Sequence, residues 1–173
     1  MSRLRRLVLT GRYFFVTCNR QRTRTSLLDE DFEILARVVG ARRQEHCFLL
    51  TAWVFLPDHW HAVVGVRYPK TISVVMESIK VGSTRQMNTR RGESGRLWQG
   101  RFFDRALRTV KEYNETVEYI HRNPVRRELA TRPEGWRWSS VHEYQPSGYA
   151  SPFGVPPLAI NRVDMPAQER TRI

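Results

Sequence analysis

Two kinds of apolar pattern alternate along this chain, and their order restricts the possible folds more than any other feature. Two helical patterns, one from Asp29 to about Gly40 or a turn later and one after Thr71, are interleaved with aromatic and β-branched runs typical of strands. These runs occupy residues 12–19, 47–55, 60–66 and 96–108. The order strand, helix, strand, strand, helix, strand is that of the ferredoxin-like split βαβ arrangement, an antiparallel sheet with helices on one face. We therefore predict an α+β fold of this class, with Asp29 as the N-cap of the first helix.

A third helix is added after this unit. Thr109 followed three residues later by Glu112 is a capping box, so the helix begins at about residue 110. It should end by Asn123, because Pro124 disfavours helical geometry in the residue before it.

Length and composition fit one folded domain. The chain has 173 residues, of which 40% are hydrophobic and 27% charged, a composition that excludes wholesale disorder. We expect a domain over residues 1–144 and a proline-rich, poorly packed tail over 145–173. No apolar stretch approaches the roughly 18–20 residues that cross a bilayer, and the arginine-rich start lacks the core of a signal peptide, so we expect a cytoplasmic protein.

The charge indicates a polyanionic partner. The formal net charge is +12, from 29 basic and 17 acidic residues, and only Lys70, Lys80 and Lys111 among the basic residues are not arginine. A GC-rich genome would explain arginine in place of lysine, but not the excess of basic over acidic residues. Arginine binds phosphate through two hydrogen bonds and stacks on bases, which favours nucleic acid.

His59 and His61 form a possible metal site. On a strand, residues i and i+2 project from the same face, so both imidazoles can reach one ion. From the spacing alone, two polar positions satisfied by hydrogen bonds are an equally good interpretation.

Tyr119 stands apart from the apolar stripe of its helix. Tyr113, Val117 and Ile120 form that stripe, whereas Tyr119 lies on a polar face with Asn123 one turn later. From the helix alone, a surface or packing role is favoured over catalysis.

Four short segments of the sequence together form a specific family signature. They are LPDHWHAV (56–63), LWQGRFFDR (97–105), YIHRNPVR (119–126) and WRWSS (136–140). Together they resemble the single-tyrosine HUH transposases of the IS200-like superfamily, specifically the REP-associated tyrosine transposases.

This resemblance implies an enzyme and a set of roles. His59 and His61 would bind a catalytic Mg²⁺ or Mn²⁺, Asn123 would be the third ligand, and Tyr119 would be the nucleophile. The reaction would be cleavage and rejoining of single-stranded DNA at REP-type hairpins, through a 5′-phosphotyrosine, at the nucleoid in a bacterial cytoplasm. The active protein would be a monomer or a homodimer.

Several basic and aromatic residues are candidates for DNA contacts. The predicted DNA-binding residues are Lys80, Arg101, Arg105, Arg108, Arg122, Arg126 and Arg127. His121 should lie at the surface or contact DNA. Trp98, Trp136 and Trp138 could stack on unpaired bases, but we expect two of the three in the core.

The sequence is also compatible with two other functions. A ferredoxin-like nucleic-acid-binding module without catalysis would use the same sheet and charge, although it leaves the histidine pair unexplained. A metal nuclease that uses water would leave Tyr119 with a structural role.

Overall fold

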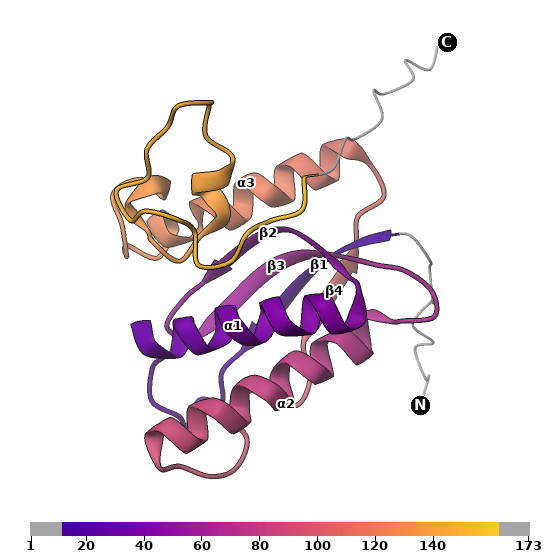
Figure 1. The fold of residues 1–173 in the computed structure, drawn as a ribbon, viewed down its shortest axis with the longest axis vertical. Coiled ribbons are helices and arrows are strands. Elements are labelled where there is room, and N and C mark those ends of the chain that lie inside the picture. The colour runs from indigo at the N-terminus through magenta and orange to yellow at the C-terminus, as the bar shows by residue number, and fades with distance from the viewer. Residues whose placement is uncertain (1–11, 163–173) are drawn as a thin grey trace.

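The computed structural model describes residues 12–162, which form one antiparallel sheet with three long helices (Figure 1). The sheet has the strand order β2-β3-β1-β4, and every neighbouring pair is antiparallel. The strands are β1 (Arg12–Asn19), β2 (Leu49–Phe55), β3 (His59–Val66) and β4 (Phe103–Ala106). This confirms the predicted ferredoxin-like α+β fold.

The helices lie on both faces of the sheet. Helices α1 (Asp29–His46) and α2 (Ile72–Arg91) lie side by side on one face, and α3 (Val110–Arg126) lies on the other (Figure 1). Alternate residues of β1 follow this division, because Val16 packs in the core under α1 and α2, whereas Phe15 packs with α3. The added helix therefore encloses a second, smaller core. No helix within residues 12–162 has the length and apolar content that a membrane span requires.

Helix α1 differs from its predicted ends. Its N-cap is Leu28, whose backbone N–H donates to the Asp31 carboxylate over 2.9 Å, so the prediction of Asp29 as N-cap is wrong. The helix continues past Gly40 to His46. A Cβ at Gly40 would meet Leu158 Cδ1 at 3.6 Å, an ordinary van der Waals contact, and this glycine lies within the helix and does not end it.

Helix α3 also continues beyond its predicted end. Thr109 is the N-cap, as predicted, and its hydroxyl accepts from Glu112 N over 3.1 Å. The prediction that the helix ends by Asn123 is wrong, because Pro124 lies inside it and the chain stays helical to Arg126. Pro124 is buried, and tertiary packing therefore outweighs the local preference of the residue before a proline.

The last predicted strand, over residues 96–108, is mostly loop. Only Phe103–Ala106 pairs with β1 as a strand, preceded by an isolated bridge between Arg20 and Trp98. Leu97 and Trp98 are nevertheless buried, and this core packing accounts for the apolar pattern that resembled a longer strand.

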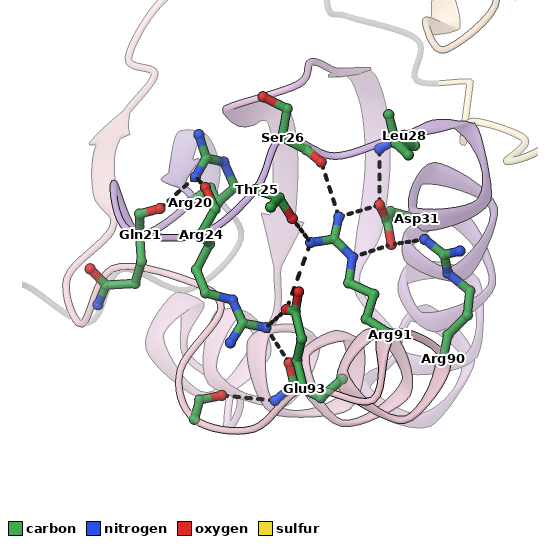
Figure 2. Close-up of polar contacts among 12 residues, drawn as sticks. Arg20, Gln21, Arg24, Thr25, Ser26, Leu28, Asp31, Arg90, Arg91 and Glu93 are labelled. Carbon is green, nitrogen blue, oxygen red and sulfur yellow. Dashed lines mark hydrogen bonds and ion pairs between the residues drawn. The ribbon is translucent and has the colours of Figure 1, made fainter.

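A buried polar cluster joins the start of α1 to the end of α2 (Figure 2). The Asp31 carboxylate is fully buried and accepts hydrogen bonds from Arg90 and Arg91. Burial by itself would raise the pKa of Asp31, but the hydrogen bonds from Arg91 and Arg90 outweigh it and hold this pKa below its usual value. Arg91 also donates to Thr25 Oγ1 and to the Ser26 carbonyl, so one side chain holds three segments together.

The segment after residue 144 packs more closely than its prolines predict. Leu158 is buried in the main core, and its carbonyl accepts a 2.9 Å hydrogen bond from Trp53 Nε1. Asn161 pairs with Leu50 through both its backbone and its side chain. The prediction of a poorly packed tail is therefore wrong for residues 158–161, whereas none of residues 145–157 is buried, and 163–173 lie outside the described residues.

Candidate active site

The two histidines lie at the start of β3, on the sheet face that α3 covers. His59 is opposite Asn19 and His61 is opposite Thr17 in the register with β1. The turn before them is held by backbone hydrogen bonds from Arg20 to Asp58 and from Leu27 to Pro57, each 2.8 Å long. Both side chains are buried, so the turn delivers two imidazoles into a defined position beneath α3.

The two imidazole rings converge through their Nε2 atoms, which lie 3.0 Å apart. The other nitrogen of each ring has its own partner. His59 Nδ1 lies 2.5 Å from Asp58 Oδ1, and His61 Nδ1 lies 2.8 Å from Thr17 Oγ1. When both Nδ1 atoms carry the proton, two Nε2 lone pairs face each other, an arrangement that a shared cation stabilises.

Burial keeps these histidines in the form that binds metals. Burial and the neighbouring His59 lower the pKa of His61 to about 3. Burial also lowers the pKa of His59, against the opposing effect of the Asp58 carboxylate. Both rings are thus neutral at neutral pH and have a lone pair to donate.

Tyr119 lies beside the histidine pair. Its ring centroid is 5.5 Å from that of His61 and 5.8 Å from that of Phe15, in edge-to-face contacts. The residue is 38% exposed, so part of this packed tyrosine remains accessible to solvent. Arg126 lies over the same ring, with its guanidinium carbon 5.2 Å from the centroid. Tyr119 therefore lies on the side of α3 that faces the histidines, and it is also partly exposed to solvent.

Asn123 of α3 is the residue that the sequence predicts as third ligand. Its side chain is buried, and its Oδ1 has no hydrogen-bond partner in the described part of the chain. It lies one helical turn after Tyr119, which contacts His61, and one turn before Arg127, which pairs with Asp58 over 3.3 Å. A buried amide oxygen without a partner is costly, and a divalent cation would satisfy it.

This set of donors fits a divalent cation. No group of three or more His, Cys, Asp or Glu residues within 12–162 could hold a metal, so a site at the histidines needs a ligand of another type. Two neutral imidazoles and an amide oxygen can coordinate one divalent cation and leave coordination positions for a phosphate.

The predicted DNA-binding residues divide into three groups. Arg126 and Arg127 lie at the site, and Arg105 donates to Thr116 Oγ1 on α3 over 3.3 Å. Arg101 and Arg108 are exposed, and Arg122 pairs with Glu118 on the outer surface of α3. Lys80 lies instead on α2, across the sheet, where its Nζ donates to the carbonyls of Gln99 and Gly100.

His121 is not at the surface. It is 7% exposed, its Nε2 lies 2.9 Å from Ser140 Oγ, and its ring packs against Tyr144. The prediction of a surface or DNA-contacting histidine is wrong, because residues 140–144 cover this face of α3. Trp98 and Trp138 are buried, which confirms the expectation of two core tryptophans.

Three residues that contact the histidines were not predicted from the sequence as part of the site. Asp58 is adjacent to His59, so its position next to a candidate ligand was an available signal. Phe15 and Thr17 carry no local signal, since they reach His61 only through the pairing of β1 with β3.

Comparisons with known proteins show the family to which the chain belongs. The chain is 29% identical over 143 residues to the REP-associated tyrosine transposase of Escherichia coli (strain K12), a match that covers 82% of this chain and 84% of the relative. A solved REP-associated tyrosine transposase bound to a REP hairpin aligns with a TM-score of 0.75 at 26% identity, over 95% of this chain and all of that chain. The family model described as "Transposase IS200 like" matches residues 8–123, which include both histidines, Tyr119 and Asn123. The chain therefore belongs to the IS200-like transposase family, whose members cleave and rejoin DNA.

Proposed function

We propose that Tyr119 is the nucleophile of a single-stranded DNA transposase. The observation that carries the proposal is the position of an accessible tyrosine ring 5.5 Å from His61, beside the pair of converging imidazoles. In the proposed step the phenol oxygen attacks a phosphorus atom and loses its proton. The bond from phosphorus to the 3′ oxygen breaks, and that oxygen takes up a proton as a free hydroxyl.

The product keeps the DNA 5′ end on the protein. A 5′-phosphotyrosine conserves the phosphodiester bond, so a 3′-hydroxyl can later attack it and release Tyr119 without ATP. One tyrosine makes one covalent link at a time. Moving a DNA segment therefore takes successive reactions of a monomer or the two sites of a homodimer.

We further propose that His59, His61 and Asn123 hold Mg²⁺ or Mn²⁺. A cation held by these residues would neutralise charge on the scissile phosphate and stabilise the leaving oxygen. Asp58 and Thr17 orient the two rings through their Nδ1 atoms, which directs both Nε2 atoms to one point.

The substrate we propose is single-stranded DNA beside a REP-type hairpin. Support comes from the relative in Escherichia coli, which is named for its REP association, and from the solved relative bound to a REP hairpin. Arg126 over Tyr119 and Arg105 on β4 are placed to hold the DNA backbone near the site. Such a protein would act at the nucleoid in the bacterial cytoplasm.

One assay tests this function directly. The full chain is incubated with end-labelled hairpin DNA that has single-stranded flanks, and with the fully paired duplex, each with Mg²⁺, with Mn²⁺ or with EDTA. We expect cleavage only in the single-stranded flank, only with metal, and an adduct between the protein and the DNA 5′ end that mass spectrometry assigns to Tyr119.

The same assay identifies the alternatives. Cleavage without an adduct, leaving ordinary phosphate and hydroxyl ends, would indicate a nuclease that uses water. Binding without cleavage under every metal condition would indicate a DNA-binding module. Either result would overturn the proposal.

A further inference from the structure

A groove on the opposite side of the sheet from Tyr119 is not accounted for by the proposed reaction. It has a volume of about 670 Å³ and lies between α2 and the loop that leads into β4. Its lining includes Lys80, Val81, Arg85, Arg96 and Trp98. A cavity of this size accommodates a small organic ligand or a few nucleotides.

The floor of the groove is apolar and rigid. Trp98 is buried, and its Nε1 donates to Ser83 Oγ over 2.9 Å, which fixes the indole against α2. Val81 on the rim is 63% exposed. Trp98 therefore supports the wall of the groove from below, and Val81 is the part of this apolar surface that an unpaired base can reach.

The charges around the groove favour a polyanion. Arg85 and Arg96 are exposed on its two sides, one on α2 and one on the loop, and neither guanidinium is held in an ion pair with a described residue. Lys80 is bound to the loop carbonyls and keeps the loop against α2. Glu77 is the one acidic residue of the lining, so basic residues outnumber it three to one.

The groove and the active site lie on two sides of one sheet edge. Strand β4 is the edge strand, next to β1 only. Phe102, just before it, packs toward the core under α1 and α2, whereas Phe103 contacts Phe15 on the side of Tyr119. A flexible single strand that leaves the active site can therefore turn around β4 past the exposed Arg101 and Arg105.

We propose that this groove binds an unpaired segment of the DNA substrate outside the scissile phosphate. Its bases would contact Val81 on the rim, and its phosphates would contact Arg85 and Arg96. This inference rests on the proposed function. The chain's own residues 1–11 are a poor occupant, because they carry three arginines and no acidic residue and would meet like charge in the groove.

Two pairs of variants test the groove without altering the catalytic residues. Val81→Glu places a negative charge on the rim, and Val74→Glu is its control, an exposed valine on the same helix outside the lining. The double variant Arg85→Ala with Arg96→Ala is compared with Arg37→Ala, an exposed arginine of α1.

The measurement is the dissociation constant by fluorescence anisotropy, for hairpins with long unpaired flanks and for hairpins trimmed to the scissile linkage. We expect both groove variants to bind the long substrates about tenfold more weakly. Their affinity for trimmed DNA and their single-turnover rate at saturating DNA should equal those of the wild type. A photoreactive iodouracil in the flank should crosslink to the peptide of α2 that contains Val81.

The outcomes separate this inference from the proposed function. The proposed role of the groove would be wrong if the groove variants bind long-flank DNA like their controls, or if crosslinks are confined to α3. Either result could occur while the wild type still cuts DNA. A wild type that forms no Tyr119 adduct would overturn the proposed function instead.

Discussion

Tyr119 of α3 and His61 of β3 lie edge to face, with their ring centroids 5.5 Å apart. Phe15 contacts both rings, stacking on His61 at 5.3 Å and meeting Tyr119 edge-on at 5.8 Å. Packing among the three rings therefore orients the tyrosine before any DNA is bound. A nucleophile held in this way loses little freedom when it reacts.

Replacing Tyr119 by phenylalanine should abolish cleavage and leave the fold intact. The change removes only the hydroxyl of a side chain that is 38% exposed, so the free energy of unfolding should change by less than about 0.5 kcal/mol. The rate of strand cleavage should fall on the order of 10⁴-fold or more, as when other nucleophiles are removed. Single-turnover kinetics with labelled single-stranded DNA would measure it.

Tyr113→Phe is the matched control on the same helix. Tyr113 is buried, and its hydroxyl lies 3.3 Å from that of Tyr144, so the variant should lose about 1 kcal/mol of stability and keep its activity. Cleavage by Tyr119→Phe, or its loss in Tyr113→Phe, would remove Tyr119 from the mechanism.

Asn123→Leu should separate metal binding from stability. The variant removes a buried oxygen that has no partner in the described structure, so the metal-free protein should be no more than about 1 kcal/mol less stable than the wild type. Its affinity for Mn²⁺, measured by calorimetry or electron paramagnetic resonance, should nevertheless fall at least about tenfold.

His61→Ala should abolish Mn²⁺ binding, since it removes one of the two imidazoles, while DNA affinity persists. His46→Ala is the control, because His46 contacts Ser78 between α1 and α2. Unchanged Mn²⁺ affinity in both Asn123→Leu and His61→Ala would place the metal elsewhere.

Stability should decline as the pH falls from about 6.5 toward 4. Burial lowers the pKa of His121 from 6.5 to about 4 in the folded protein, with a smaller effect from His142. In this window the unfolded chain takes up a proton at His121 that the folded protein does not, so acid favours unfolding by up to about 1.4 kcal/mol per pH unit for this group. His121→Gln should show a shallower decline in urea denaturation, and an identical slope would contradict a neutral, buried His121.

Asp31→Asn should destabilise the protein strongly. The carboxylate is fully buried against Arg91, which is 8% exposed, and breaking such a pair costs about 3–5 kcal/mol. Glu45→Gln provides the comparison, because the Glu45–Arg42 pair is exposed and should contribute less than about 1 kcal/mol. Equal denaturation midpoints for the two variants would show that the cluster in Figure 2 contributes little.

Leu158→Ala should also lower stability, by about 2–5 kcal/mol, because the side chain is buried in the main core. Val155→Ala, three residues earlier and 90% exposed, should have almost no effect. If the two variants unfold at the same urea concentration, the segment after residue 144 is not part of the folded core.

The sequence alone determined the features that depend on neighbouring residues. The i and i+2 spacing of His59 and His61 places both rings on one face of a strand, and Thr109 caps its helix as predicted. The element order, too, follows from local apolar periods, so the ferredoxin-like sheet was predictable without any long-range information.

Features that depend on contacts between distant segments required the tertiary structure. Nothing near His121 in the sequence indicates that Ser140 and Tyr144 cover it. Likewise, nothing near Lys80 indicates that its ammonium group donates to the carbonyls of Gln99 and Gly100. Pro124 stays helical for the same reason, since burial compensates for the local conformational cost. Periodicity and capping act over a few residues, whereas the burial of a side chain depends on which distant segments fold against it.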